Sequence, residues 1–339
     1  MTILESKKMK KPKIGLVGYF GWGNFGDELF LQAHKEFLSE NYDLEVVHDQ
    51  LTQPYFSDKA LEQLKEFDGF LIGGGDLLNP NAVSPLYWKK EYLEKPVFVH
   101  GIGCPVLKVK SSKSLDYFNQ FFASDSVKHI CLRDIESKEY FDACVKPKQA
   151  TVTYPDAVFA MGMPAIGKRK EKILGIVLRS HKSLVGDYSN LRKAADEAVQ
   201  LGYRVRLIVG AFGDLGAGDL SVTKDFAKHG EELVYSDDLN ELSQAIGECS
   251  LVLSMKFHAL VVGAMYSVPV IQLSTTQKNR NLFRYLQRPD LMGNYHDTEL
   301  YRKIPPIPAP IHSLLVGKLK RDSRLGYDLL LSKMNEVFY

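Results

Sequence analysis

Short runs of β-branched and other apolar residues alternate along the chain with longer segments in which apolar residues recur every three or four positions. The short runs are typical of buried strands, and the longer spacing is typical of helices that cover a sheet. In the first half, strands are expected at 14–17, 44–48, 69–72, 97–100 and 129–132, with helical spacing at 28–38 and 137–144. This alternation predicts βαβ units and one doubly wound, parallel sheet.

The second half repeats the pattern after an aperiodic stretch, 165–172, that contains glycine and lysine. Strands are expected at 173–178, 205–209, 233–235, 251–253 and 269–273, and helices at 190–200, 239–248 and 258–265. We therefore predict an α/β protein with two doubly wound, Rossmann-like domains, an N-terminal one at 1–165 and a C-terminal one at 172–310.

The last segment, 311–339, forms an amphipathic tail after two prolines. Its apolar positions include Leu325, Leu329, Leu330 and Met334, which recur at helical spacing. We expect this tail to be a helix that packs back on the first domain.

Composition narrows the class of protein. The 339 residues are 45% hydrophobic and 25% charged, with a formal net charge of +2, as in an ordinary globular chain that has no general affinity for nucleic acid. Five lysines lie in the segment from Lys7 to Lys13. This segment is either a solvated tract or one that is weakly attracted to an anionic membrane surface. With no apolar run near 20 residues and no secretory signal, we expect a cytoplasmic protein with at most a peripheral contact at the inner face of the membrane.

The four cysteines have no metal-ligand spacing, so neither a zinc site nor a disulfide framework is expected. A dinucleotide cofactor has to be considered, because residues 21–26 read GWGNFG after the first strand and Asp49 follows the second. Two features argue against it. Residues 18–20 separate the strand from the motif, and the bulky Trp22 and Phe25 would crowd a pyrophosphate.

Glycine-rich turns follow two further strands of the first sheet. Residues 73–76 read GGGD, and residues 101–103 read GIG. Carboxyl ends of parallel strands share one edge of a sheet, and consecutive glycines let backbone N–H groups approach a ligand there. The second domain has a matching feature, because Lys256 and His258 stand where the strand 251–253 gives way to a helix. A cation and an imidazole at a helix N-terminus indicate an anionic substrate.

In combination and order these segments resemble the polysaccharide pyruvyl transferases, which move an enolpyruvyl unit from phosphoenolpyruvate onto a sugar. The segments that carry the resemblance are Asn24-Phe25-Gly26-Asp27, Gly73-Gly74-Gly75, Gly101-Ile102-Gly103 with Pro105, Leu132-Arg133-Asp134 with Ser137, Pro155-Asp156, and the strand and helix around His258 that end at Pro269. The resemblance implies the two-domain fold of the B class of glycosyltransferases (GT-B). It also implies an acceptor site on the N-terminal domain and a phosphoenolpyruvate site chiefly on the C-terminal one.

The family commonly has Arg two positions before the histidine, where this chain has Lys256. A lysine offers a point charge in place of a planar fork, so anion binding is expected to persist with looser geometry. The resemblance further implies that Arg179, after the first strand of the second domain, is a second anion-binding residue.

The expected roles follow from the chemistry of ketal formation. His258 is the expected general acid, because an imidazole titrates near neutral pH, and Asp27 or Asp76 is the expected base for the acceptor hydroxyl. For Asp27 the alternative is a purely structural role in the first turn of a helix. The residues expected to bind substrate are Arg179, Lys256, Asn24, Gly26, Gly74, Gly75 and Asp76.

No cofactor or metal is expected. The acceptor is expected to be a sugar of a surface polysaccharide repeat unit, either lipid-linked or nucleotide-linked. Two other functions stay open, because a fold does not fix function: a glycosyltransferase that uses a nucleotide sugar, and a non-catalytic carbohydrate-binding protein on the same scaffold.

Overall fold

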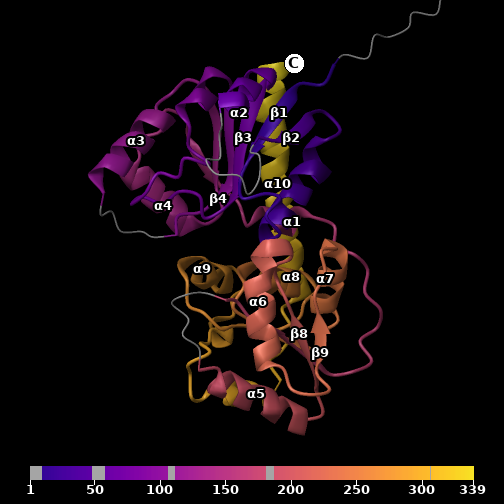
Figure 1. Ribbon diagram of the computed structural model, residues 1–339. Helices are drawn as coiled ribbons and strands as arrows, with labels where there is room; N and C mark the ends of the chain where they lie inside the picture. The colour runs from indigo at the N-terminus through magenta and orange to yellow at the C-terminus, as the bar shows by residue number, and fades with distance from the viewer. Residues whose placement is uncertain (1–9, 48–57, 106–110, 181–186, 306) are drawn as a thin grey trace, which may run out of the picture.

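The computed structural model describes residues 10–47, 58–105, 111–180, 187–305 and 307–339. Lys7, Lys8 and Asp49, which the sequence singles out, lie outside these described residues. Two parallel sheets, each covered by helices, lie one above the other in Figure 1. In the described part of the chain, no helix is both long enough and apolar enough to cross a membrane.

The first sheet has six parallel strands in the order β2-β1-β3-β4-β5-β6. The strands are β1 (Lys13–Val17), β2 (Asp43–Val46), β3 (Gly69–Gly75), β4 (Val97–Ile102), β5 (Val127–Leu132) and β6 (Thr151–Thr153). The helices of this half are α1 (Phe25–Leu38), α2 (Asp58–Gln63), α3 (Ser112–Phe122) and α4 (Ile135–Cys144), with 3₁₀ turns η1 (Leu64–Glu66), η2 (Lys90–Glu94) and η3 (Ala157–Ala160). The strand order reverses between β1 and β3, which is the switch point where doubly wound sheets bind ligands.

The second sheet has five parallel strands in the order β11-β10-β7-β8-β9. The strands are β7 (Ile173–Val177), β8 (Arg204–Ile208), β9 (Glu232–Val234), β10 (Leu251–Ser254) and β11 (Val270–Gln272). The helices are α5 (Ser189–Gln200), α6 (Gly213–Phe226), α7 (Leu239–Gly247), α8 (Phe257–Met265) and α9 (Gln277–Tyr285), with η4 (Pro289–Leu291) and η5 (Leu300–Lys303). Here the order reverses between β7 and β10, as in a dinucleotide-binding sheet.

Each strand expected from the apolar runs coincides with a strand of the structure, with ends displaced by a few residues. The pattern does not predict β6, which has only three residues, all half-buried. It also does not predict α3, α6 and α9 individually. In α6 the glycines at 216 and 218 interrupt the apolar spacing, so the helix has little periodic signal.

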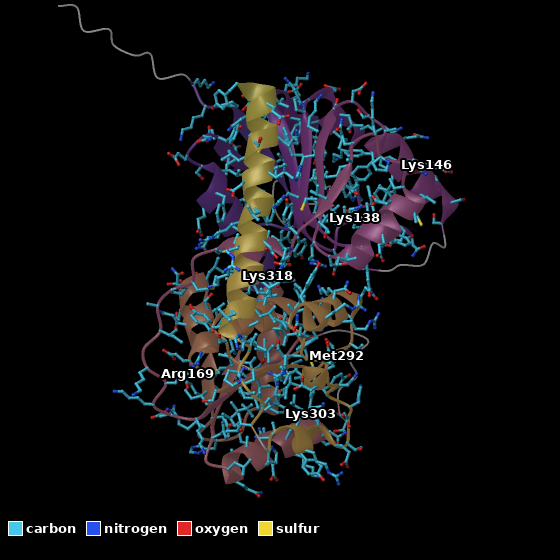
Figure 2. The ribbon with its side chains drawn as sticks, turned by 180° about the vertical axis from the view of Figure 1, so that it is seen from behind. Lys138, Lys146, Arg169, Met292, Lys303 and Lys318 are labelled. Carbon is cyan, nitrogen blue, oxygen red and sulfur yellow. The ribbon has the colours of Figure 1, made fainter. Side chains whose placement is uncertain are left out.

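Helix α10 (Ser313–Phe338) packs on η3, β4 and β5 of the first sheet. Figure 2 shows it from behind, running along the first domain, with Lys318 near the level at which the domains meet. Its buried face includes Leu319, Tyr327, Leu330 and Met334. Leu325, expected among the packed apolar positions, is instead 54% exposed, because it projects away from the sheet.

The two domains share one continuous hydrophobic cluster. It includes Phe25, Leu29 and Phe30 of α1 together with Leu260 and other buried residues of α8. Helices α1 and α8 lie in contact where the domains meet (Figure 1). Burial of this apolar surface fixes how the carboxyl edge of one sheet faces the carboxyl edge of the other.

Candidate active site

A cavity of about 380 Å³ lies between the two switch points. Segments after β1, β3 and β5 form its wall on the first domain, and segments after β7, β8, β10 and β11 form its wall on the second. The polar and glycine residues that line it are Asn24, Gly26, Asp27, Gly75, Asp76, Arg133, Arg179, Gly210, Lys256, His258, Ser274, Thr276, Lys278 and Asn279. A volume of this size holds a small molecule.

Eight of the nine residues singled out from the sequence line this cavity: His258, Asp27, Arg179, Lys256, Asn24, Gly26, Gly75 and Asp76. Gly74 does not. It has a φ of +84°, and a Cβ there would lie 2.6 Å from Cγ of Phe30. Position 74 therefore requires glycine, because the backbone makes a tight turn that packs on α1. Glycine adopts this positive φ without strain.

The loop after β1 is joined to the second domain by its backbone. Asn24 forms an antiparallel bridge with Ala211, and the N–H of Phe212 donates to the carbonyl of Gly23 at 2.8 Å. Gly23 has a φ of +82°, and a Cβ there would lie 2.3 Å from the carbonyl oxygen of Phe212. The glycines of this motif thus serve the contact between the domains, a role different from the pyrophosphate cradle that the same spacing has in dinucleotide-binding proteins.

His258 lies in the first turn of α8 and points into the first domain. A Cβ on Gly26 would lie only 1.8 Å from its Nδ1, so the imidazole rests directly against the backbone of α1. Phe30 meets the ring edge-on, with centroids 5.1 Å apart. Its Nε2 lies 3.7 Å from Oδ2 of Asp156, and the side chain is 11% exposed.

Asp27 lies in the first turn of α1 and accepts a hydrogen bond from the side-chain amide of Asn24. Burial raises the pKa of Asp27 to about 6, although His258, Lys278 and the amide of Asn24 act in the opposite direction. A carboxyl group with such a pKa can exchange a proton near neutral pH.

Lys256 and Arg179 lie on the second-domain wall of the cavity. The ammonium of Lys256 pairs with Oδ2 of the buried Asp219 at 2.6 Å, and Oδ1 of Asp219 accepts from the N–H of Ser180 at 2.7 Å. Burial lowers the pKa of Lys256, Asp219 acts against that change, and Arg179 adds to it. Arg179 itself is exposed and makes no ion pair with any described residue.

The buried Arg133 and the carboxylates around it form a second group of charges. The sequence predicts Asp76 but not Arg133 as a site residue. Its guanidinium pairs with Asp76 and faces Asp134 at 3.9 Å and Asp156 at 3.8 Å. Burial by itself would lower the pKa of Arg133, but the three carboxylates raise it. A Cβ on Gly103 would lie 2.5 Å from Nη2 of Arg133, so the glycine-rich turn after β4 makes room for this side chain.

Lys278 lies at the start of α9 in the second domain and lines the cavity. It is the fourth cation there, after Lys256, Arg179 and Arg133. Its ammonium lies 3.0 Å from Oδ2 of Asp76, and both Lys278 and Arg133 lie over the ring of Phe257, at 5.4 and 5.2 Å from its centroid. Burial would raise the pKa of Asp76, but Arg133 and Lys278 lower it to about 2. Asp76 therefore remains an anion and bridges the two domains.

One group of three side chains among the described residues has metal-ligand chemistry: His100, His129 and Cys131. None of them lines the cavity, and they lie next to Tyr327 of α10. Nδ1 of His100 is 3.4 Å from Nε2 of His129, and burial lowers the pKa of both imidazoles, that of His129 to about 4. A neutral, hydrogen-bonded pair accounts for this contact as part of the packing of α10.

Comparison with known proteins identifies the family. The family model for polysaccharide pyruvyl transferases matches residues 24–276, and the chain belongs to this family, which is a family of transferases. The match begins at Asn24 of the loop after β1 and ends at Thr276, so it includes most of the residues that line the cavity and leaves out Tyr19, Lys278 and Asn279. No curated protein matches the chain.

Solved structures with very different sequences have the same fold. S. aureus MnaA with UDP has a TM-score of 0.58 at 10% identity and covers 95% of each chain. HepE (Alr3699) from Anabaena with UDP and glucose has a TM-score of 0.57 at 12% identity, over 96% of this chain and all of that one. UDP-GlcNAc 2-epimerase from Methanocaldococcus jannaschii has a TM-score of 0.57 at 10% identity, over 95% of this chain and 100% of that one. These likenesses confirm two Rossmann-like domains in the GT-B arrangement.

Proposed function

We propose that the protein forms a pyruvate ketal on a sugar of a surface polysaccharide or its precursor, in the cytoplasm, with phosphoenolpyruvate as donor. The observation that carries this proposal is the convergence of four cations, Arg133, Arg179, Lys256 and Lys278, on one cavity that also holds His258. Phosphoenolpyruvate carries a phosphate and a carboxylate, and several cationic donors are needed to bind both groups.

The second-domain wall suits the donor. Arg179 has a guanidinium that is exposed and makes no ion pair with the described residues, so it can bind a phosphate or carboxylate through two parallel hydrogen bonds. Lys256 is held in place by Asp219 and still lines the cavity. Because an ammonium has three donors, Lys256 can contact an anion while it keeps its bond to Asp219.

His258 is proposed to protonate the methylene carbon of the enol, which leaves a cationic centre at the carbon that bears the phosphate. A sugar hydroxyl attacks that carbon and loses its proton to a base. Phosphate then leaves with the proton held by the base, and a neighbouring hydroxyl attacks the resulting cationic carbon to close the ketal while its proton returns to His258. Asp27 suits the base better than Asp76, because the pKa of Asp27 is about 6 and that of Asp76 is about 2, with both oxygens of Asp76 in ion pairs.

The first-domain wall is proposed to bind the acceptor sugar. Tyr19 and Tyr87 line the cavity there, and Tyr19 stacks on Trp22 with ring centroids 5.0 Å apart. Aromatic side chains offer an apolar face together with a polar tip, a combination that suits the mixed surface of a sugar ring. Asp27 lies on the same wall, within the same cavity.

Titration calorimetry with phosphoenolpyruvate tests the donor without knowledge of the acceptor. We expect saturable binding that is weakened by Lys256→Ala and retained by Lys224→Ala, since Lys224 is an exposed lysine of α6 outside the cavity. Binding of a UDP-sugar or NADH, with no response to phosphoenolpyruvate, would refute the proposed donor. The UDP-sugar arm matters because HepE and MnaA, which share the fold, were solved with UDP.

Turnover is then measured as phosphate release from phosphoenolpyruvate in the presence of a panel of p-nitrophenyl glycosides and UDP-sugars. His258→Ala is expected to reduce kcat by about 10² to 10⁴, the contribution of a general acid, with a smaller effect on donor affinity. His229→Ala is the matched control, because His229 is an exposed histidine outside the cavity. Full activity of a folded His258→Ala variant would exclude the acid role.

A further inference from the structure

Asp156 is a buried carboxylate with no assigned role in the proposed reaction. It precedes η3 in the first domain, where its Oδ1 accepts a hydrogen bond from the N–H of Val158 at 3.1 Å. The side chain is only 3% exposed. One oxygen is thus fixed by the backbone, and this fixes the direction in which the other oxygen points.

The second oxygen, Oδ2, points at two nitrogen atoms. It lies 3.7 Å from Nε2 of His258 and 3.8 Å from Nη1 of Arg133. All three atoms are buried, and none has a hydrogen-bond partner within the described part of the chain. A carboxylate oxygen buried beside two N–H donors is placed to accept from them, and a contraction of about 0.8 Å would make a hydrogen bond of ordinary length with the imidazole.

The surroundings of His258 leave its ring little freedom. Phe30 meets the imidazole from the first domain, and Phe257 meets it from α8, with the ring centroid of Phe257 5.0 Å away. Nε2 is buried on the side of Asp156, whereas Nδ1 is the atom nearest to Gly26, which lines the cavity. Asp27 is the other carboxylate that interacts with this ring, and it lies on the cavity side.

We propose that Asp156 is the positioning residue for His258: it accepts the Nε2–H of the imidazole and so directs Nδ1, the nitrogen that carries the transferred proton, toward the cavity. This inference rests on the proposed role of His258 as the acid. An ionised carboxylate behind an imidazole holds one tautomer and one ring orientation, and it stabilises the imidazolium before the proton is transferred.

Arg133 has a part in this arrangement. Burial by itself would raise the pKa of Asp156, but His258 and Arg133 hold it below its ordinary value. Asp156 is therefore an anion at neutral pH even though it is buried. The guanidinium supplies a permanent positive charge beside the same oxygen, so Asp156 remains an acceptor after His258 has given up its proton.

The contact crosses the boundary between the domains. Asp156 and Gly26 belong to the first domain, and His258 belongs to the second. The oriented imidazole is consequently a property of the assembled interface. A variant that loosens the interface is expected to lose the oriented acid before it loses either fold.

The test uses Asp156→Asn, because asparagine keeps the oxygen that accepts from Val158 and places an uncharged NH2 group, which donates and does not accept, where Oδ2 faces His258. Long-range ¹H–¹⁵N spectra of histidine-labelled protein report which ring nitrogen carries the proton, and His258→Gln identifies the signals among the nine histidines. We expect one neutral tautomer of His258, protonated at Nε2, in the wild type and a mixture of tautomers in Asp156→Asn. Asp134→Asn is the control, because Asp134 is also buried, caps α4 and faces Arg133 without contacting His258.

Steady-state kinetics give a second test of the proposed role of Asp156. In Asp156→Asn we expect kcat to fall about 10²-fold, while the Kd for phosphoenolpyruvate stays within about threefold of the wild-type value. A folded Asp156→Asn variant with the wild-type tautomer of His258 would overturn the proposal, as would a loss of donor affinity equal to the loss of kcat. If the wild type itself does not turn over phosphoenolpyruvate, the proposed function fails, and the spectra alone decide whether Asp156 orients His258.

Discussion

Replacement of Gly26 by alanine tests whether the place of His258 against α1 matters for turnover. The added Cβ would lie 1.8 Å from Nδ1, 2.5 Å from Cγ and 2.8 Å from Cε1 of His258. Ordinary van der Waals contact begins at about 3.4 Å, so the ring or the first turn of α1 has to move by about 1.5 Å. Phe30 and Phe257 pack against the imidazole and resist a simple rotation.

A displacement of about 1 Å of a catalytic group costs about 10² in rate, so Gly26→Ala is expected to reduce kcat by at least that factor. The effect on folding should be modest. Overpacking costs about 1–3 kcal/mol, whereas alanine in place of glycine within a helix contributes about 0.5–1 kcal/mol in the opposite direction. The net loss of unfolding free energy should therefore not exceed about 2.5 kcal/mol.

The assay is phosphate release from phosphoenolpyruvate, with urea unfolding as the measure of stability. Gly167→Ala is the matched control, because a Cβ at Gly167 has no atom within 4 Å and its turnover should be unchanged. Wild-type kcat in a folded Gly26→Ala variant would show that the position of the imidazole against α1 is not critical. The assignment of the acid to His258 would then lose its structural support.

Three further predictions concern the charges of the cavity. Lys256→Ala should raise the Kd for phosphoenolpyruvate, measured by calorimetry, at least about tenfold, and Lys256→Arg should preserve the wild-type Kd. Equal affinities in the wild type and both variants would contradict the anion site. Arg133→Ala removes the cation that three carboxylates share, of which only Asp76 keeps a lysine partner, Lys278. The change should lower the unfolding free energy by about 3–5 kcal/mol, measured by urea unfolding, and an unchanged midpoint would oppose this. The pKa of Asp27 is raised from 3.8 to about 6 on folding, so its stabilising contribution is complete below pH 3.8 and is lost as the pH rises through 6. Asp27→Asn should therefore be more stable than the wild type at pH 8, by at most about 3 kcal/mol, with the difference absent at pH 3.5.

The residues at strand ends could be predicted from the sequence, because a strand end is a local feature. Apolar runs locate β1, β3, β7 and β10, and the residues that follow them must share the edge where parallel strands terminate. Asn24, Asp27, Asp76 and Lys256 follow from this rule, whereas Arg179 is implied by the resemblance to the family. All five line the cavity. Gly74 shows the limit of the approach, since two adjacent glycines satisfy the same pattern while only Gly75 reaches the cavity.

Lys278 and Asp156 could not be assigned to the site from the sequence, because their contacts depend on how the domains meet. Lys278 begins a helix with little apolar signal, and its partner Asp76 lies in the other domain. Asp156 reaches His258 where η3 packs on α8, a contact between the domains that no periodicity encodes. Arg133 stands directly after β5 and carries a charge, so the rule for strand ends could have included it.

Helix α10 also has a consequence for the order in which the chain can fold during synthesis. Tyr327, Leu330 and Met334 of α10 belong to the same hydrophobic cluster as Ile14 and Phe98 of the first sheet. When the first domain has emerged from the ribosome, α10, which packs on one face of the sheet of that domain, has not yet been synthesised. N-terminal domains usually fold first, but here this face of the first sheet cannot be fully buried until the second domain has been translated. The last helix to be synthesised therefore completes the core of the first domain to be synthesised.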